Sequence, residues 1–145
     1  MIDRLRRSIR TRLESITREW LFRRKLPKEF GSVRIIVSPC AGLKYLFKSM
    51  NEVDKPLLSI ANQFIKGGDV VWDIGANIGI FSFAAASKSG PTGKVIAFEP
   101  DSWLVQVLRR SAREIPDSCA EVAVVPVAVA RESVERSLTY ETRVL

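Results

Sequence analysis

A short loop in the middle of the chain combines residue types that are typical of a nucleotide-type ligand site. Asp73 follows an apolar run, Gly75 and Gly79 come after it, and Asn77 lies between the two glycines. Glycine lets the backbone turn tightly and lets a ligand approach it closely. A helix that begins at Gly79 would present its free N–H groups toward such a ligand. The pattern therefore predicts a ligand cradle where a strand meets a helix.

The residue types in this loop discriminate between ligands. A dinucleotide-binding loop has the pattern G-x-G-x-x-G, in which the second glycine makes room for a pyrophosphate. Here Asn77 takes that position, and the carboxylate of Asp73 would repel a pyrophosphate. S-Adenosylmethionine carries an ammonium, a carboxylate and a sulfonium group and no phosphate, so the charges favour it as the cofactor. An NAD-dependent oxidoreductase is disfavoured for the same reason.

A second acidic residue is placed to reach the same ligand. Glu99 follows the β-type run Lys94–Phe98 and lies 24 residues after Gly75. An acid at this position accepts hydrogen bonds from ribose hydroxyls, in NAD enzymes as well, so it indicates a ribose ligand without identifying it. The alternative is that Asp73 only caps the turn, the glycines only reverse the chain, and Glu99 is a solvated acid.

These residues resemble the first two motifs of the FkbM-family methyltransferases, a group of class I S-adenosylmethionine-dependent enzymes. The resemblance is carried by Val70–Phe81 and Val95–Pro100, and it covers residues 40–140. It implies a Rossmann-like fold and O-methylation of a hydroxyl on a small molecule, sugar, glycan or natural product. It also implies which residues bind the cofactor, although no catalytic residue is identified. The methionine side would contact Asp73, Gly75, Asn77 and Gly79, and the ribose would contact Glu99.

The sequence beyond the third predicted strand departs from the family pattern. The family continues with a fourth strand bearing a motif similar to Lys-Ile-Asp-Val-Glu-Gly, which is missing here. We therefore expect a C-terminally incomplete sheet with Val70–Ile74 as an open edge, unless the N-terminal helix, Val33–Val37 or another chain covers it. Two hypotheses follow. One is an O-methyltransferase or its cofactor-binding half, and the other is a truncated, non-catalytic methyltransferase-like domain that serves as a binding or interaction module.

The pattern around the loop alternates strands and helices, which is typical of a parallel α/β sheet. The predicted strands are Val33–Val37, Val70–Ile74, Lys94–Phe98 and a segment within Ala120–Ala130. Helices are expected to begin near Asp54, Gly79 and Asp101, with the two aspartates as N-caps. The predicted buried face of the first helix is Leu57, Ile60, Ala61, Phe64 and Ile65.

The N-terminal residues differ in charge from the rest. Residues 1–30 hold ten Lys and Arg and four Asp and Glu, whereas the remainder holds thirteen and twelve. Apolar residues recur every three or four positions from Ile2 to Trp20 and predict a basic amphipathic helix. We expect an arm over 1–30 and a partial methyltransferase domain over 31–145. The helix could dock on the domain or a partner, or lie on a membrane surface through residues 1–25.

Composition restricts the remaining function classes. The chain has no histidine, which excludes a His-based triad or a Cys/His zinc site within it, and we expect no metal site. Its two cysteines predict free thiols rather than a disulfide. The near-neutral body disfavours nucleic acid as a partner. With no signal peptide or spanning segment in the sequence, a cytoplasmic location is expected.

Overall fold

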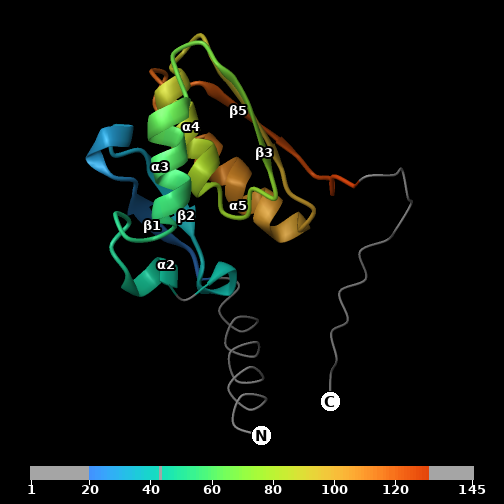
Figure 1. Ribbon diagram of the computed structural model, residues 1–145. Helices are drawn as coiled ribbons and strands as arrows, with labels where there is room; N and C mark the ends of the chain where they lie inside the picture. Colours follow the sequence, from blue (N-terminus) through green and yellow to red (C-terminus); the bar gives the residue numbers. More distant parts are fainter. Residues whose placement is uncertain (1–19, 43, 131–145) are drawn as a thin grey trace, which may run out of the picture.

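The computed structural model describes residues 20–42 and 44–130, which form a mixed α/β fold around a three-stranded parallel sheet (Figure 1). The strands, in sheet order, are β3 (Val70–Ile74), β4 (Lys94–Phe98) and β5 (Glu121–Val125). Val71 lies opposite Val95, and Val95 lies opposite Val122. This arrangement is compatible with a fragment of a Rossmann-like sheet.

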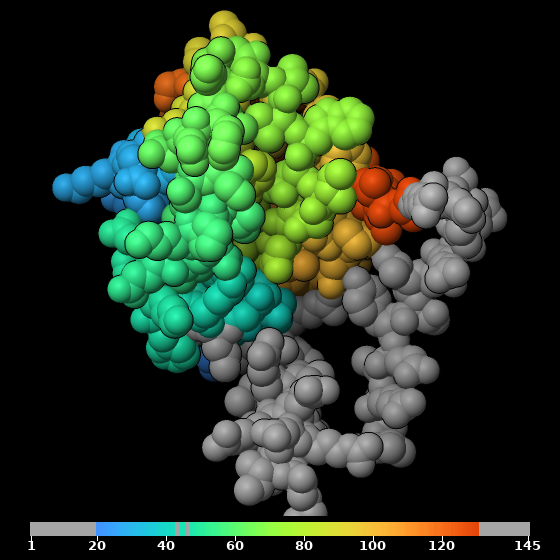
Figure 2. All heavy atoms as spheres, in the orientation of Figure 1, coloured from blue at the N-terminus to red at the C-terminus, as the bar shows by residue number. Residues whose placement is uncertain are grey.

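Three helices accompany the sheet. They are α3 (Lys55–Phe64), α4 (Ile80–Ser89) and α5 (Ser102–Ala112), and a short α2 (Lys44–Phe47) precedes them. α4 connects β3 to β4, and α5 connects β4 to β5. They pack on the side of the sheet where Val71, Val95 and Val122 are buried. α3 packs on α4 and forms part of the outer surface in the space-filling view (Figure 2).

The first described residues form an antiparallel hairpin of β1 (Phe22–Lys25) and β2 (Arg34–Val37). The strands are followed by the 3-10 turns η1 (Lys28–Phe30) and η2 (Pro39–Ala41). α5 contacts both β2 and β5, and the Ile36 amide donates a hydrogen bond of 2.9 Å to Ser111 Oγ. Because β2 pairs with β1 and packs on α5, it does not cover the edge of β3.

Residues 22–30 differ from the helical arm that the sequence predicts. Phe22–Lys25 is a strand, and Leu26 and Phe30 are 2% and 0% exposed. Phe22–Lys25 pairs with β2, a partner that helical periodicity within the arm does not reveal. These residues therefore belong to the packed body. The predicted amphipathic helix runs from Ile2 to Trp20; residues 1–19 lie outside the described residues, and Trp20 belongs to no helix.

The predicted strands and helices of the second half are confirmed to within a few residues. β4 spans Lys94–Phe98 as predicted, and β5 lies within the apolar run that predicts a third strand. Asp101 caps α5 because its Oδ1 accepts hydrogen bonds from the amides of Trp103 and Leu104, at 2.8 and 3.1 Å. The apolar runs and the capping residue in the sequence are therefore sufficient to predict these elements.

α3 begins directly after Asp54, as predicted, but the predicted cap contact and part of the predicted buried face are not found. Asp54 precedes the helix, but its carboxylate bonds to Lys44 and Tyr45 rather than capping it. Leu58 and Ala61 are the buried residues of α3. Three residues of the predicted buried face are exposed instead, namely Leu57, Ile60 and Phe64. The helical period and the burial of Ala61 are confirmed, whereas Leu58 completes the buried face in place of the three exposed residues.

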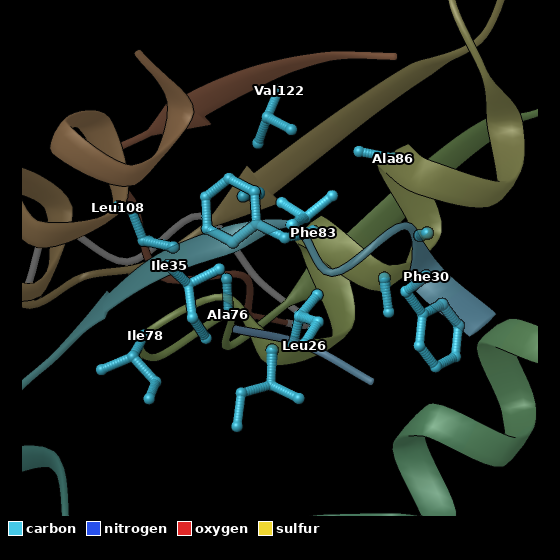
Figure 3. Packing of buried hydrophobic residues seen from close by; sticks show 14 of the residues in the cluster. Leu26, Phe30, Ile35, Ala76, Ile78, Phe83, Ala86, Leu108 and Val122 are labelled. Carbon is cyan, nitrogen blue, oxygen red and sulfur yellow. The ribbon is translucent and has the colours of Figure 1, made fainter. Parts of the chain in front are cut away.

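The hydrophobic core lies between the sheet, the helices and the hairpin. Phe83 of α4, Leu108 of α5 and Ile35 of β2 are each at most 1% exposed and lie in one cluster (Figure 3). Close packing of this kind leaves little freedom for the elements it joins. The core therefore holds the beginning of α4 against the ends of β3 and β4.

The opposite side of the sheet is exposed in the described part of the chain. Val70, Trp72 and Ile74 are 65%, 64% and 59% exposed. Trp72 contacts the ring of Phe98, with centroids 5.4 Å apart. Within the described ranges β3 pairs only with β4, so its prediction as an edge strand is confirmed for these residues.

Two further observations concern the cysteines and the membrane. Cys40 and Cys119 are free thiols, as predicted. None of the helices in residues 20–42 and 44–130 has the length and apolar character needed to cross a bilayer. A cytoplasmic location stays a prediction.

Candidate cofactor site

The loop from Asp73 to Gly79 connects β3 to α4, as the sequence predicts. Gly75, Asn77 and Gly79 have φ values of 81°, 54° and 85°. This left-handed region is open to glycine and is tolerated by asparagine better than by most residues. Three such residues within five turn the chain sharply from the strand into the helix.

The backbone amides of the loop are bonded to the protein itself. The amides of Gly75 and Ala76 both donate to the carbonyl oxygen of Phe98, at 2.9 and 3.0 Å. The Gly79 amide donates to the carbonyl of Ala76 at 2.8 Å. These bonds fix the loop on the end of β4. A ligand would therefore bind through other groups of the loop.

Glu99 joins the two loops that follow β3 and β4. Its Oε2 accepts a hydrogen bond of 2.8 Å from the Asn77 amide, and its Oε1 accepts one of 2.9 Å from the Asp101 amide. The side chain belongs to a residue that is only 6% exposed. Each carboxylate oxygen still has a second acceptor position. The structure thus brings Asn77 and Glu99 together, through a backbone contact that the motif does not reveal.

Asp73 lies on the side of β3 that faces α4. Its Oδ2 accepts a hydrogen bond from the Ser82 hydroxyl, which links the strand to the first turn of the helix. Burial raises the pKa of Asp73; the hydrogen bonds from Ser82 oppose this shift, and the charge of Glu99 adds to it. Sequence reasoning missed Ser82, although a hydroxyl in the first helical turn after a strand-end acid is a usable signal. Contact between Asp73 and a cofactor stays a prediction.

The two glycines of the loop have different surroundings. A Cβ placed on Gly79 would lie 2.5 Å from Phe83 Cε2 and 2.6 Å from Leu108 Cδ2. A Cβ placed on Gly75 would meet no atom within 4 Å among the described residues. Gly79 is therefore required by the core, whereas Gly75 borders open space that a ligand could enter.

The Asn77 side chain holds an acceptor without a partner. Its Oδ1 is buried and makes no hydrogen bond within the described part of the chain. Buried polar atoms in native proteins are almost always paired, so an orphaned one calls for a donor that a ligand could supply. The candidate site thus offers carboxylate and amide oxygens as acceptors, and these suit a ligand that donates hydrogen bonds.

Two concave surfaces lie elsewhere on the molecule. One of about 420 Å³ lies between the hairpin and α5, and one of about 570 Å³ lies between η1 and α3. Neither is lined by a residue of the Asp73–Gly79 loop. In residues 20–42 and 44–130, no three His, Cys, Asp or Glu side chains gather in a way that could hold a metal ion.

No family model matches the chain, and neither does any curated protein. The resemblance to the FkbM family therefore stays a prediction from the two sequence motifs.

Proposed function

We propose that this chain is the cofactor-binding part of an S-adenosylmethionine-dependent O-methyltransferase with a Rossmann-like fold. The observation that carries the proposal is a set of acceptors at the ends of β3 and β4, where Gly75 borders open space. They are the Glu99 carboxylate, which holds the Asn77 amide, and Asn77 Oδ1, which has no partner among residues 20–42 and 44–130. S-Adenosylmethionine donates hydrogen bonds through its ammonium group and its ribose hydroxyls. The acceptors suit these donors.

The same geometry is unfavourable for a dinucleotide. A pyrophosphate is bound by free backbone N–H groups at the beginning of a helix. Here the amides of Gly75 and Ala76 are used by the Phe98 carbonyl, and the Asn77 amide is used by Glu99. With these three amides occupied and acceptors available beside them, the loop favours a cationic ligand over an anionic one. The occupied backbone amides therefore disfavour a pyrophosphate for the same kind of reason as the carboxylate of Asp73, which would repel it.

Each residue has a distinct part in the proposal. Glu99 accepts from the ribose hydroxyls with its remaining lone pairs, and Asn77 Oδ1 accepts from a donor on the methionine side. Gly75 leaves the space, while Asp73 and Gly79 hold the loop in shape through Ser82 and the core. When bound, the cofactor supplies an electrophilic methyl group. The acceptor class, a hydroxyl of a small molecule or glycan, follows from the motif resemblance.

Calorimetric titration with S-adenosylhomocysteine tests the proposal. Gly75→Ala places a methyl group in the open space and should weaken binding by at least about tenfold, or 1.4 kcal/mol. Gly68→Ala is the matched control, because Gly68 has a φ of 85° and a Cβ there would meet only Thr92 Oγ1 at 3.7 Å. Gly68→Ala should bind like the wild type. Absence of binding at millimolar ligand, or equal losses in both variants, would overturn the proposal, and tight NADH binding would favour an oxidoreductase.

A second candidate, a non-catalytic interaction module, is favoured by the exposed face of β3. Val70, Trp72 and Ile74 form an apolar row on β3, whose outer edge pairs with no strand of residues 20–42 and 44–130, and open edges pair readily with other chains. Sedimentation velocity of the wild type and Trp72→Ser separates the candidates. A chain that ignores S-adenosylhomocysteine and dissociates on Trp72→Ser would support the module over the enzyme.

A further inference from the structure

The concave surface between the hairpin and α5 has an apolar floor. Leu21, Phe22 and Ile36 form this floor, within a cavity of about 420 Å³. The hydrogen bond from the Ile36 amide to the buried Ser111 hydroxyl holds β2 against α5 beneath it. The hairpin and α5 therefore form most of the depression, and Leu21, Arg113 and Glu114 lie directly beside these elements.

The rim of this surface is basic. Arg23, Arg110 and Arg113 line it, with Glu114 as the one acid in the lining. Glu114 accepts hydrogen bonds of 3.0 and 2.8 Å from the Arg23 guanidinium. Arg34 is close enough for its charge to act on Glu114 as well. Within residues 20–42 and 44–130, the guanidinium groups of Arg110 and Arg113 have no hydrogen-bond or ion-pair partner.

We propose that this rim and floor, which we call the headgroup surface, bind the phosphate of an anionic phospholipid at a membrane. Guanidinium groups match phosphate oxygens in geometry and charge. Clustered arginines are attracted to anionic leaflets. Phe22 of the floor and Trp20, which directly precedes Leu21 in the chain, are 41% and 57% exposed, and aromatic residues are enriched at the membrane–water interface.

Charge and apolarity together favour a membrane over a nucleic acid. A phosphate backbone alone would need only the arginines, whereas Phe22 of the floor and Trp20, two residues earlier in the chain, add exposed aromatic area. The sequence immediately before Trp20 carries six further arginines, at positions 4–18. Single-stranded DNA also combines arginine contacts with aromatic stacking, so it serves as the competing probe.

Co-sedimentation of the full chain with vesicles tests the headgroup surface. Binding to phosphatidylcholine vesicles that contain phosphatidylglycerol should fall roughly 10- to 30-fold in the double variant Arg110→Gln/Arg113→Gln, at about 1 kcal/mol per arginine. Lys48→Gln/Lys66→Gln is the control with the same net charge, because both lysines are exposed and lie outside this surface. The control should bind within about twofold of the wild type, as salt screens distant charges. Equal losses in the two double variants would overturn the proposal.

A variant that gains affinity makes the test specific. Glu114→Gln removes the acid and releases Arg23, so binding to the anionic vesicles should tighten several-fold. Glu52→Gln changes the net charge equally at an exposed residue outside the surface and should have little effect. Weaker binding of Glu114→Gln, or equal binding of the wild type to pure phosphatidylcholine, would contradict the proposal. Displacement of the chain from vesicles by free glycerol phosphate would overturn the proposal in favour of a site for soluble phosphates. Displacement by single-stranded DNA would overturn it in favour of a nucleic-acid site.

Discussion

The two ends of the β3–α4 loop have similar sequences and opposite environments. At one end, Gly79 lies against Phe83 and Leu108, where no additional atom fits. At the other, Gly75 has the same left-handed backbone and open space beside it. The difference separates a glycine required by the fold from one that leaves room for a ligand. The motif therefore combines a glycine that the core requires with a glycine beside which a ligand could bind.

Glu99 combines a predicted binding role with an observed structural role. It is the predicted ribose ligand, and it also bridges the amides of Asn77 and Asp101. Loss of cofactor binding in a Glu99 variant would not by itself show contact, because the loop would lose its support as well. Measurements of stability and of binding have to be made on the same variants.

Gly79→Ala should have the largest effect. Its methyl group would overpack the core and occupy a left-handed backbone, which together cost about 3 kcal/mol in the free energy of unfolding. Equilibrium urea denaturation with a shared m value measures this loss. A loss no greater than that of Gly75→Ala would remove the distinction between the two glycines.

Glu99→Gln should come next. A glutamine side chain has one acceptor oxygen, so either the Asn77 or the Asp101 amide loses its partner, at a cost of about 1–3 kcal/mol. Glu52→Gln, on an exposed side chain, is the control and should change stability by less than about 0.5 kcal/mol. Comparable urea midpoints for the two variants would show that the Glu99 bridge does not support the loop.

Gly75→Ala should cost about 1–2 kcal/mol, because only the left-handed backbone penalizes the added methyl group. Gly68→Ala, with a similar φ and nearly empty surroundings, should lose about as much. The two variants should differ only in their affinity for S-adenosylhomocysteine. A much larger stability loss at Gly75 would mean that the protein fills the space beside it. That result would contradict the claim that Gly75 borders open space.

Asp73→Asn should have the smallest effect and the clearest pH dependence. Burial raises the pKa of Asp73, so the folded wild type binds its proton more tightly than the unfolded chain does. The stability of the wild type relative to the variant should therefore be greatest below the ordinary carboxyl pKa and should fall as pH rises through the raised one. Urea denaturation from about pH 3 to about pH 7 measures the difference. A difference that grows with pH would show that the bonds from Ser82 outweigh burial.

Local signals predicted much of the fold. β4 and the Asp101 cap of α5 follow from residues that are adjacent in the chain, and the structure confirms them. The hairpin strand at Phe22–Lys25 was missed because its hydrogen bonds go to β2, about ten residues away. The buried side of α3 was predicted only in part, with Ala61 correct, because periodicity fixes the spacing of apolar residues but does not state which side meets α4.

The candidate site divides in the same way. The sequence by itself determined the residue types at the ends of β3 and β4, since a strand–glycine loop–helix junction is encoded in a dozen consecutive positions. Only the tertiary structure decided that Gly79 is packed and Gly75 is open, that Glu99 holds the Asn77 amide, and that Arg110 and Arg113 border an apolar floor. These features depend on contacts between elements that are distant in the chain. The surroundings of each glycine, amide and arginine are set by packing between elements, and no repeating pattern in the sequence reveals that packing.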